Sequence, residues 1–263
     1  MTPRPTETLR LSHATLRVSS LEKARAFYAD ILGFYARQGE GILELATSEE
    51  GTALITLLEH PGAQPKPRRA AGLFHLAILF PTRASLAEAL SRIATRRYPM
   101  QGMSDHAVSE AIYLADPDDN GIELYADRPR ETWPKVNGIL SMGTEPLDVE
   151  DLLATLPSQV SSHVPTDLRL GHIHLNVTAL SPAEAFYHNK VGLDVTVRSY
   201  PGALFMAADG YHHHLGLNTW MRSDQPAPQD TAGVVDFTFS RRGLYAAQAF
   251  TDPDGLKVKI VPF

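Results

Sequence analysis

The sequence contains no cysteine among its 263 residues. This absence excludes disulfides, thiolate zinc sites, iron–sulfur clusters and cysteine nucleophiles, so any metal must be held by His, Asp, Glu, Tyr or water. There is no stretch of 18 apolar residues and no apolar signal-peptide core near the start, so we expect no membrane segment and a cytoplasmic protein. A net charge of −6 without a cluster of Lys and Arg argues against a nucleic-acid surface.

An internal repeat organises the chain. The most extensive similarity has a constant offset of 159 residues and aligns His13 with His172. The repeated segments are 11–34 with 170–193, 72–79 with 233–240, and 116–124 with 252–260. Similarity at fixed spacing indicates duplication, so we interpret the chain as four related units.

Each unit begins with an alternating strand, continues through a helix and returns to strands. In unit one, apolar residues after residue 20 recur at helical spacing, and Gly33 is expected to end the helix. The offset between units two and four falls from 161 to 136 residues, so unit four lacks 25 residues and most of its helix. The pattern predicts an α+β fold of tandem βαβββ modules, with the last of the four units truncated.

A segment rich in Pro, Gly and Ser separates the two halves of the chain. It spans 128–168 and contains one short predicted helix, at 149–156. We therefore expect a first domain at 8–127, a connector at 128–168 and a second domain at 169–263.

Histidines and a glutamate in the predicted strands suggest a metal site. His75 opens unit two, and Glu123 lies between apolar residues in the last strand of that unit, where a buried carboxylate needs a partner or a metal. Two His and one carboxylate leave coordination positions open for substrate and oxygen. The repeat offers His13 or His172 as the third ligand, and His174 is a further contender on the same strand face as His172.

Unit three is the preferred partner of unit two because it carries a polar run, His212, His213 and His214, on a predicted late strand. Histidine is the usual proton donor and acceptor near neutral pH. Strand alternation directs His213 to the opposite face from its two neighbours, so we choose His213 as the inward residue and His172 as the third ligand. If units one and two pair instead, His13 becomes the ligand and His213 loses its role.

Unit four is not expected to bind metal. Asp236 and Lys259 stand where unit two has His75 and Glu123, and a lysine at a ligand position repels a cation. We expect unit four to serve as a packing partner for unit one.

The unit pattern resembles the vicinal oxygen chelate superfamily, in particular the Bacillus-type catechol 2,3-dioxygenases among the extradiol enzymes. The motifs that carry the resemblance are GLFHLAIL at 72–79, DHAVSEAIY at 105–113, DPDDNGIELYADRPRETW at 116–133, GHIHL at 171–175 and GYHHHLGLNTW at 210–220. The resemblance implies modules that pair into cup-shaped mixed β-sheets. It also implies Fe(II), or Mn(II), held by His75, Glu123 and His172.

The same resemblance implies a reaction and further site residues. A catecholic or hydroquinone substrate would bind the metal beside O₂, and the ring would open next to its hydroxyls. His213 would be the acid/base residue, Tyr113 would contact a substrate hydroxyl, and His106 would support the substrate oxygen. Tyr113 also lies ten residues before Glu123 across one tight turn, which places it near that residue in a hairpin.

Other functions on the same fold are a glyoxalase-type isomerase, an epoxide-opening resistance enzyme and a metal-free protein that binds aromatic compounds. The last would use an aromatic cleft, for which Trp220, Tyr125 and Trp133 are available. We expect a homo-oligomer, since oligomers are common among such modules.

Overall fold

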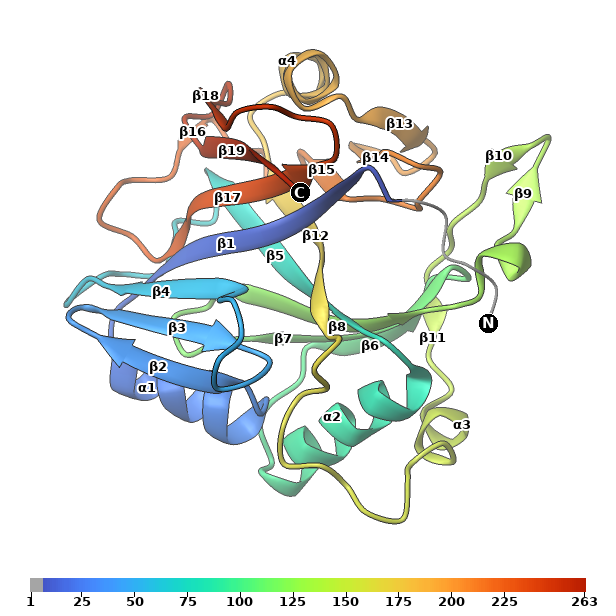
Figure 1. Cartoon of the computed structure of the whole chain (residues 1–263). Helices are drawn as coiled ribbons and strands as arrows, with labels where there is room; N and C mark the ends of the chain where they lie inside the picture. The colour runs from blue at the N-terminus through green and yellow to red at the C-terminus, as the bar shows by residue number, and fades with distance from the viewer. Residues whose placement is uncertain (1–6) are drawn as a thin grey trace.

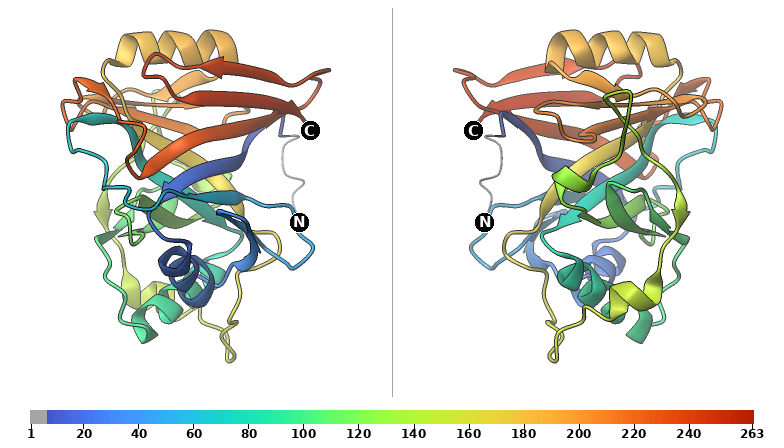
Figure 2. Two further views of the ribbon diagram at one scale, coloured as in Figure 1. Left: turned by 90° about the vertical axis from the view of Figure 1, so that its left-hand side faces the viewer. Right: turned by 90° about the vertical axis from the view of Figure 1, so that its right-hand side faces the viewer.

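The structure, a computed structural model, describes residues 7–263 as curved mixed β-sheets with few helices (Figure 1). This confirms the predicted α+β class and cup-shaped sheets. The helices lie on the outside, with α4 at one end of the molecule and α1 and α2 at the other, in every view (Figures 1 and 2). Within the described residues, no helix is both long and apolar enough to cross a membrane.

Units one and two have the predicted order of elements. Unit one contains β1 (Leu9–Val18), α1 (Leu21–Arg25), a π-helical turn (Ala26–Ile31), β2 (Tyr35–Gly39), β3 (Ile42–Ala46) and β4 (Ile55–Glu59). Unit two contains β5 (Ala70–Phe80), α2 (Arg83–Thr95), β6 (Gly102–Asp105), β7 (Ser109–Ala115) and β8 (Gly121–Asp127).

Unit three repeats this order, and unit four lacks the helix and one strand. Unit three contains β12 (Arg169–Asn176), α4 (Leu180–Phe186), a π-helical turn (Tyr187–Val191), β13 (Asp194–Val197), β14 (Ala203–Ala207) and β15 (Leu215–Asn218). After the short β16 (Gln225–Pro226), unit four contains β17 (Gly233–Arg241), β18 (Gln248–Thr251) and β19 (Lys257–Pro262). No helix lies between β17 and β18 in this fully described stretch, as the shortened offset predicts.

The first helix shows how the local sequence sets these elements. The Ser20 side chain accepts a hydrogen bond from the Lys23 backbone N–H and caps the N-terminus. The helix is buried in the core through Leu21 and Ala24, and the π-helical turn that continues it through Phe27 and Tyr28. Gly33 follows the helix with a φ of +92°, a conformation that costs glycine little, and its N–H bonds to the Ala29 carbonyl.

Strand pairing exchanges partners between the two halves of the chain. The seven-stranded sheet has the order β18-β19-β17-β1-β4-β3-β2, so it joins units one and four. The other sheet has ten strands: its main path is β11-β6-β7-β8-β5-β12-β15-β14-β13, and β16 pairs with β5 off this path. This sheet joins units two and three. Both pairings predicted from the residue types of the units are therefore confirmed.

Tyrosines of the helices link the units a second time. The Tyr28 hydroxyl of unit one donates to Asp116 Oδ2 in the turn of unit two, at 3.0 Å. The equivalent Tyr187 of unit three donates to Asp252 Oδ2 in the turn of unit four, at 2.8 Å. Burial raises the pKa of Asp116 to about 6, although several hydrogen bonds favour its charged form. These hydrogen bonds therefore join the two units within each half of the chain, while the sheets join units of different halves.

The connector is more ordered than its composition predicts. It holds a 3₁₀ turn (Arg130–Thr132), β9 (Lys135–Val136), β10 (Ile139–Leu140), β11 (Glu145–Pro146) and α3 (Val149–Leu153). Strand β11 pairs with β6 and so extends the ten-stranded sheet. Asp151 of α3 forms an ion pair with Arg83 at the start of α2, at 2.7 Å. The connector therefore packs along unit two, which brings it close to the predicted site.

Candidate metal centre

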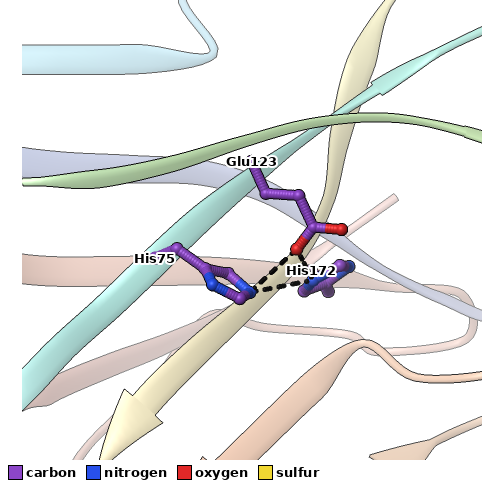
Figure 3. Close-up of side chains that lie close together, drawn as sticks. All are labelled: His75, Glu123 and His172. Atoms are coloured by element: carbon purple, nitrogen blue, oxygen red, sulfur yellow. Dashed lines mark hydrogen bonds and ion pairs between the residues drawn. The ribbon is translucent and has the colours of Figure 1, made fainter. Parts of the chain in front are cut away.

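Three neighbouring strands place His75, Glu123 and His172 around one point (Figure 3). Strand β5 pairs with β8 on one side and with β12 on the other, and Ala77 of β5 faces both Glu123 and His172. His75 lies two residues from Ala77, so its side chain is on the same face of the sheet. The Glu123 Oε2 atom is 2.9 Å from His75 Nε2 and 3.0 Å from His172 Nε2, and the two nitrogens are 3.3 Å apart.

The cluster is buried, and the protonation states of Glu123 and His172 suit metal binding. Relative exposure is 7% for His75, 3% for Glu123 and 1% for His172. Burial raises the pKa of Glu123, but the adjacent His172 and His75 outweigh burial and hold that pKa well below its usual range. Burial lowers the pKa of His172 to about 4 against the opposing effect of Glu123. An ionised carboxylate thus lies beside a neutral imidazole, as metal ligation requires.

The two alternatives for the third ligand make contacts outside the cluster. His13 is on β1 in the seven-stranded sheet, where its Nε2 is 2.9 Å from the Thr56 hydroxyl. His174 is beside the cluster, but its Nε2 is 3.0 Å from the Asn218 amide nitrogen. His172 is therefore the histidine of β12 that the structure brings together with Glu123.

Tyr113 and His106 form a pair at the edge of the cluster. Tyr113 of β7 is in register with Glu123 of β8, as their spacing across the turn predicts. Its hydroxyl is 2.6 Å from His106 Nε2, and His106 Nδ1 is 2.7 Å from the Gly143 carbonyl in the connector. Burial, together with the nearby Glu123, raises the pKa of Tyr113 well above its usual value.

The three consecutive histidines do not lie on a strand, so the structural assumption behind their alternation was wrong. Strand β15 begins only at Leu215, and the preceding chain turns at Asp209 and Gly210, which have φ values of +57° and +64°. This turn breaks the extended conformation before the strand can start. The histidines nevertheless point in different directions.

Of these three histidines, His213 lies beside the cluster of His75, Glu123 and His172. Its ring centroid is 4.0 Å from that of His172, and it lines the adjacent cavity. His212 Nε2 is instead 2.9 Å from Asp127 Oδ1, and His214 Nδ1 accepts a hydrogen bond from the Ala208 N–H. Burial and the surrounding histidines lower the pKa of His213 well below its usual value, which favours the neutral ring.

A cavity of about 350 Å³ opens beside the cluster. Its walls are mainly aromatic and apolar, and within residues 7–263 they include no lysine or arginine. Trp220 is 43% exposed and lines the cavity, whereas Tyr125 and Trp133 are buried and do not line it. The lining includes Phe74, Tyr113, Met142, Tyr200, Phe205 and Trp220.

Sequence reasoning missed Asp127 and the connector residues at the site. Asp127, which contacts His212, shares the strand face of Glu123, and that alternation in β8 could have identified it. The connector, which lies outside the repeat, contributes Met142, Gly143 and Thr144. No repeat position marks these connector residues.

Comparisons with known proteins agree with this architecture. The Glyoxalase/Bleomycin resistance protein/Dioxygenase superfamily matches residues 10–124. Catechol-2,3-dioxygenase of Bacillus subtilis (strain 168) is 41% identical over 88% of this chain and 82% of its own length. Biphenyl-2,3-diol 1,2-dioxygenase 2 of Rhodococcus globerulus is 26% identical over 62% of this chain and 87% of its own length.

Solved structures share the fold at low sequence identity. Glyoxalase I from Zea mays superimposes with a TM-score of 0.57 at 16% identity, over 97% of this chain and 92% of the other. A protein from Bacillus subtilis subsp. subtilis str. 168 gives a TM-score of 0.62 at 12% identity, over 98% and 86%. At these identities the likeness concerns the fold alone.

Proposed function

The chain belongs to the glyoxalase/bleomycin resistance protein/dioxygenase superfamily, and from this premise we propose that it is a metal-dependent extradiol dioxygenase that cleaves a catechol with O₂. The observation that carries the proposal is the buried cluster of His75, Glu123 and His172 beside an aromatic cavity that also holds Tyr113 and His213. The 41% identity to a protein named catechol-2,3-dioxygenase supports the choice of reaction.

The donor atoms of the cluster fit a metal of the Fe(II) or Mn(II) type. Neighbouring ligands of an octahedral ion with bonds of about 2.1 Å lie about 3 Å apart, and the three donor atoms are separated by 2.9, 3.0 and 3.3 Å. Two imidazoles and one carboxylate on one face leave positions for other ligands. When bound, Fe(II) or Mn(II) would hold the catechol oxygens and O₂ side by side and conduct electron density between them.

Tyr113 is assigned to orient the substrate. Because its pKa is raised well above the usual value, its hydroxyl stays protonated at neutral pH and acts through hydrogen bonding. His106, fixed by the Gly143 carbonyl, holds that hydroxyl in place. A substrate hydroxyl at the edge of the cluster would therefore meet the Tyr113 oxygen.

His213 is assigned to move protons. It lines the cavity against His172, and its neutral ring can accept a proton from the substrate and return it later in the reaction. Burial excludes bulk water from this exchange, since His213 is 8% exposed.

The cavity walls suit a flat, neutral aromatic ring. Phe74, Phe205 and Trp220 offer edges and faces for contact with such a ring. A carboxylate on the substrate would find no lysine or arginine among the described lining residues, and Glu123 would repel it. We therefore assign a catechol that is unsubstituted or carries a neutral group.

Ring cleavage of catechol tests the proposal. The purified chain is loaded with Fe(II) without oxygen, and O₂ uptake and the absorbance of the yellow ring-opened product are then followed together. We expect both signals in equal amounts, and their loss in Glu123→Ala with an unchanged circular dichroism spectrum. Glu44→Ala, in the seven-stranded sheet, is the control and should behave as the unmodified chain.

If neither signal appears with one bound iron per chain across a panel of substituted catechols and hydroquinones, the proposed reaction is wrong. An isomerase or resistance enzyme on the same metal cluster would then be the better hypothesis. Failure to bind any metal would favour a metal-free aromatic-binding protein.

A further inference from the structure

A chain of hydrogen bonds leads from Asp127, at the end of β8, to His213. Asp127 Oδ1 is 2.9 Å from His212 Nε2, and His212 Nδ1 is 2.7 Å from His213 Nδ1. His212 is fully buried and its ring also packs against Trp133, with centroids 5.2 Å apart. The chain therefore connects a carboxylate to a ring that lines the cavity.

With His212 neutral, the carboxylate determines the direction of both bonds in this chain. Asp127 can only accept when it is ionised, so His212 Nε2 carries the hydrogen of the first contact. A neutral His212 then has a lone pair at Nδ1, and His213 Nδ1 must donate the hydrogen of the second contact. A neutral His213 consequently has its lone pair at Nε2, which makes no hydrogen bond to any of the residues described.

Two buried tyrosines hold Asp127 from the other side. The Tyr211 hydroxyl donates to Asp127 Oδ1 at 3.2 Å and lies 2.8 Å from the Tyr125 hydroxyl. Because Tyr211 donates to the carboxylate, its oxygen can accept from Tyr125. The ring of Tyr125 in turn packs on His172, with centroids 5.0 Å apart. Donors thus converge on Asp127 from both directions and fix its role as acceptor.

We propose that Asp127 and His212 are positioning residues that hold His213 as the Nδ1–H tautomer and present its Nε2 to the cavity as a proton acceptor. The use of that nitrogen on a substrate rests on the proposed function, whereas the tautomer follows from the protein's own contacts. In this arrangement His213 is ready to take a proton without first rotating or exchanging its own. A ring with the hydrogen at Nε2 would be a donor toward the cavity instead.

Nitrogen-15 NMR of the histidine rings tests the tautomer directly. The chain, labelled with ¹⁵N-histidine, is loaded with diamagnetic Zn(II), and His213→Asn identifies the His213 signals by their loss. We expect a protonated Nδ1 and an unprotonated Nε2 at His213. The opposite pattern would overturn the proposal.

Variants of His212 then test whether His212 determines the tautomer of His213. In His212→Phe the acceptor is gone, so the His213 signals should shift toward a mixture of tautomers. His212→Asn keeps an acceptor near the position of Nδ1 and should restore the Nδ1–H form. His214→Asn is the matched control, since His214 is an equally buried neighbour outside the hydrogen-bond chain, and it should leave the His213 signals unchanged.

Turnover provides the second measurement. With Fe(II) bound and catechol as substrate, His212→Phe should lower kcat by about 10- to 100-fold with little change in KM, and His212→Asn should recover most of the loss. A preserved tautomer in His212→Phe would refute the proposal whatever the rate. If no form of the chain cleaves catechol while the NMR result is as expected, the proposed function fails and the tautomer assignment stands.

Discussion

Lys259 Nζ lies 3.1 Å from Asp236 Oδ1 in the seven-stranded sheet, at the two repeat positions that Glu123 and His75 occupy in the ten-stranded sheet. The strand register is the same in both. Thr238 pairs with His13 and Lys259, just as Ala77 pairs with His172 and Glu123. An ion pair within the protein therefore occupies the place where the other sheet gathers ligands.

This equivalence predicts one metal ion per chain. The double variant Asp236→His/Lys259→Glu removes the ammonium group. It also restores two ligand types beside His13. We expect the number of bound Fe(II) ions, measured by elemental analysis after anaerobic loading, to rise from one to two. Asp236→His alone should stay at one because Lys259 still repels the cation. A count of two in the unmodified chain would contradict the prediction.

Much of this arrangement could be predicted because the repeat carries it. The offset that aligns His13 with His172 identifies equivalent strand positions, and the residue types at Asp236 and Lys259 show which unit lost its ligands. Alternation in β8 also places Glu123 on a buried face. These features depend on period and residue chemistry, which a sequence records directly.

The conformation of His212 to His214 could not be predicted in the same way. Alternation applies only to an extended chain, and the left-handed turn at Asp209 and Gly210 ends that condition before the histidines. The contact between His106 and Gly143 depends on the path of the connector, which has no equivalent in the other half of the chain. Tertiary packing, rather than local pattern, decides both.

Replacing Tyr113 with phenylalanine should separate its role from metal binding. Tyr113→Phe removes the hydroxyl that is hydrogen-bonded to His106. It removes no atom of His75, Glu123 or His172. We expect kcat for catechol to fall by about 100-fold, the size typical of lost proton-transfer or hydrogen-bonding assistance, while iron content is unchanged. Tyr98→Phe is the control, since that hydroxyl donates to the Ala115 carbonyl outside the cavity. Equal losses in the two variants would argue against a specific role for Tyr113.

The composition of the cavity wall predicts discrimination by substrate charge. Burying a carboxylate without a cation is costly, so 3,4-dihydroxybenzoate should have a kcat/KM at least about tenfold below that of 4-methylcatechol. Gln101 lines the cavity and is exposed, so Gln101→Arg can add a cation while its charge remains in contact with water. Gln101→Arg should reduce the difference in kcat/KM between the two substrates, and Gln101→Leu should leave it unchanged. Similar efficiencies for both substrates in the unmodified chain would exclude this basis of specificity.

The folded state should lose stability as the pH falls, and His214 should account for part of this loss. Burial lowers the pKa of His214 to about 3, whereas an unfolded histidine titrates near 6.5. Between these values the unfolded chain binds the extra proton, so the folded state loses stability as the pH falls below about 6.5.

His214→Asn removes this titration while keeping an acceptor for the Ala208 N–H. From pH 7 to pH 5 the free energy of unfolding of the unmodified chain should therefore fall by about 2 kcal/mol more than that of the variant. Urea unfolding at each pH, with a chelator present so that metal release does not contribute, measures the difference. The remaining histidines are common to both proteins, so equal slopes would mean that folding does not lower the pKa of His214.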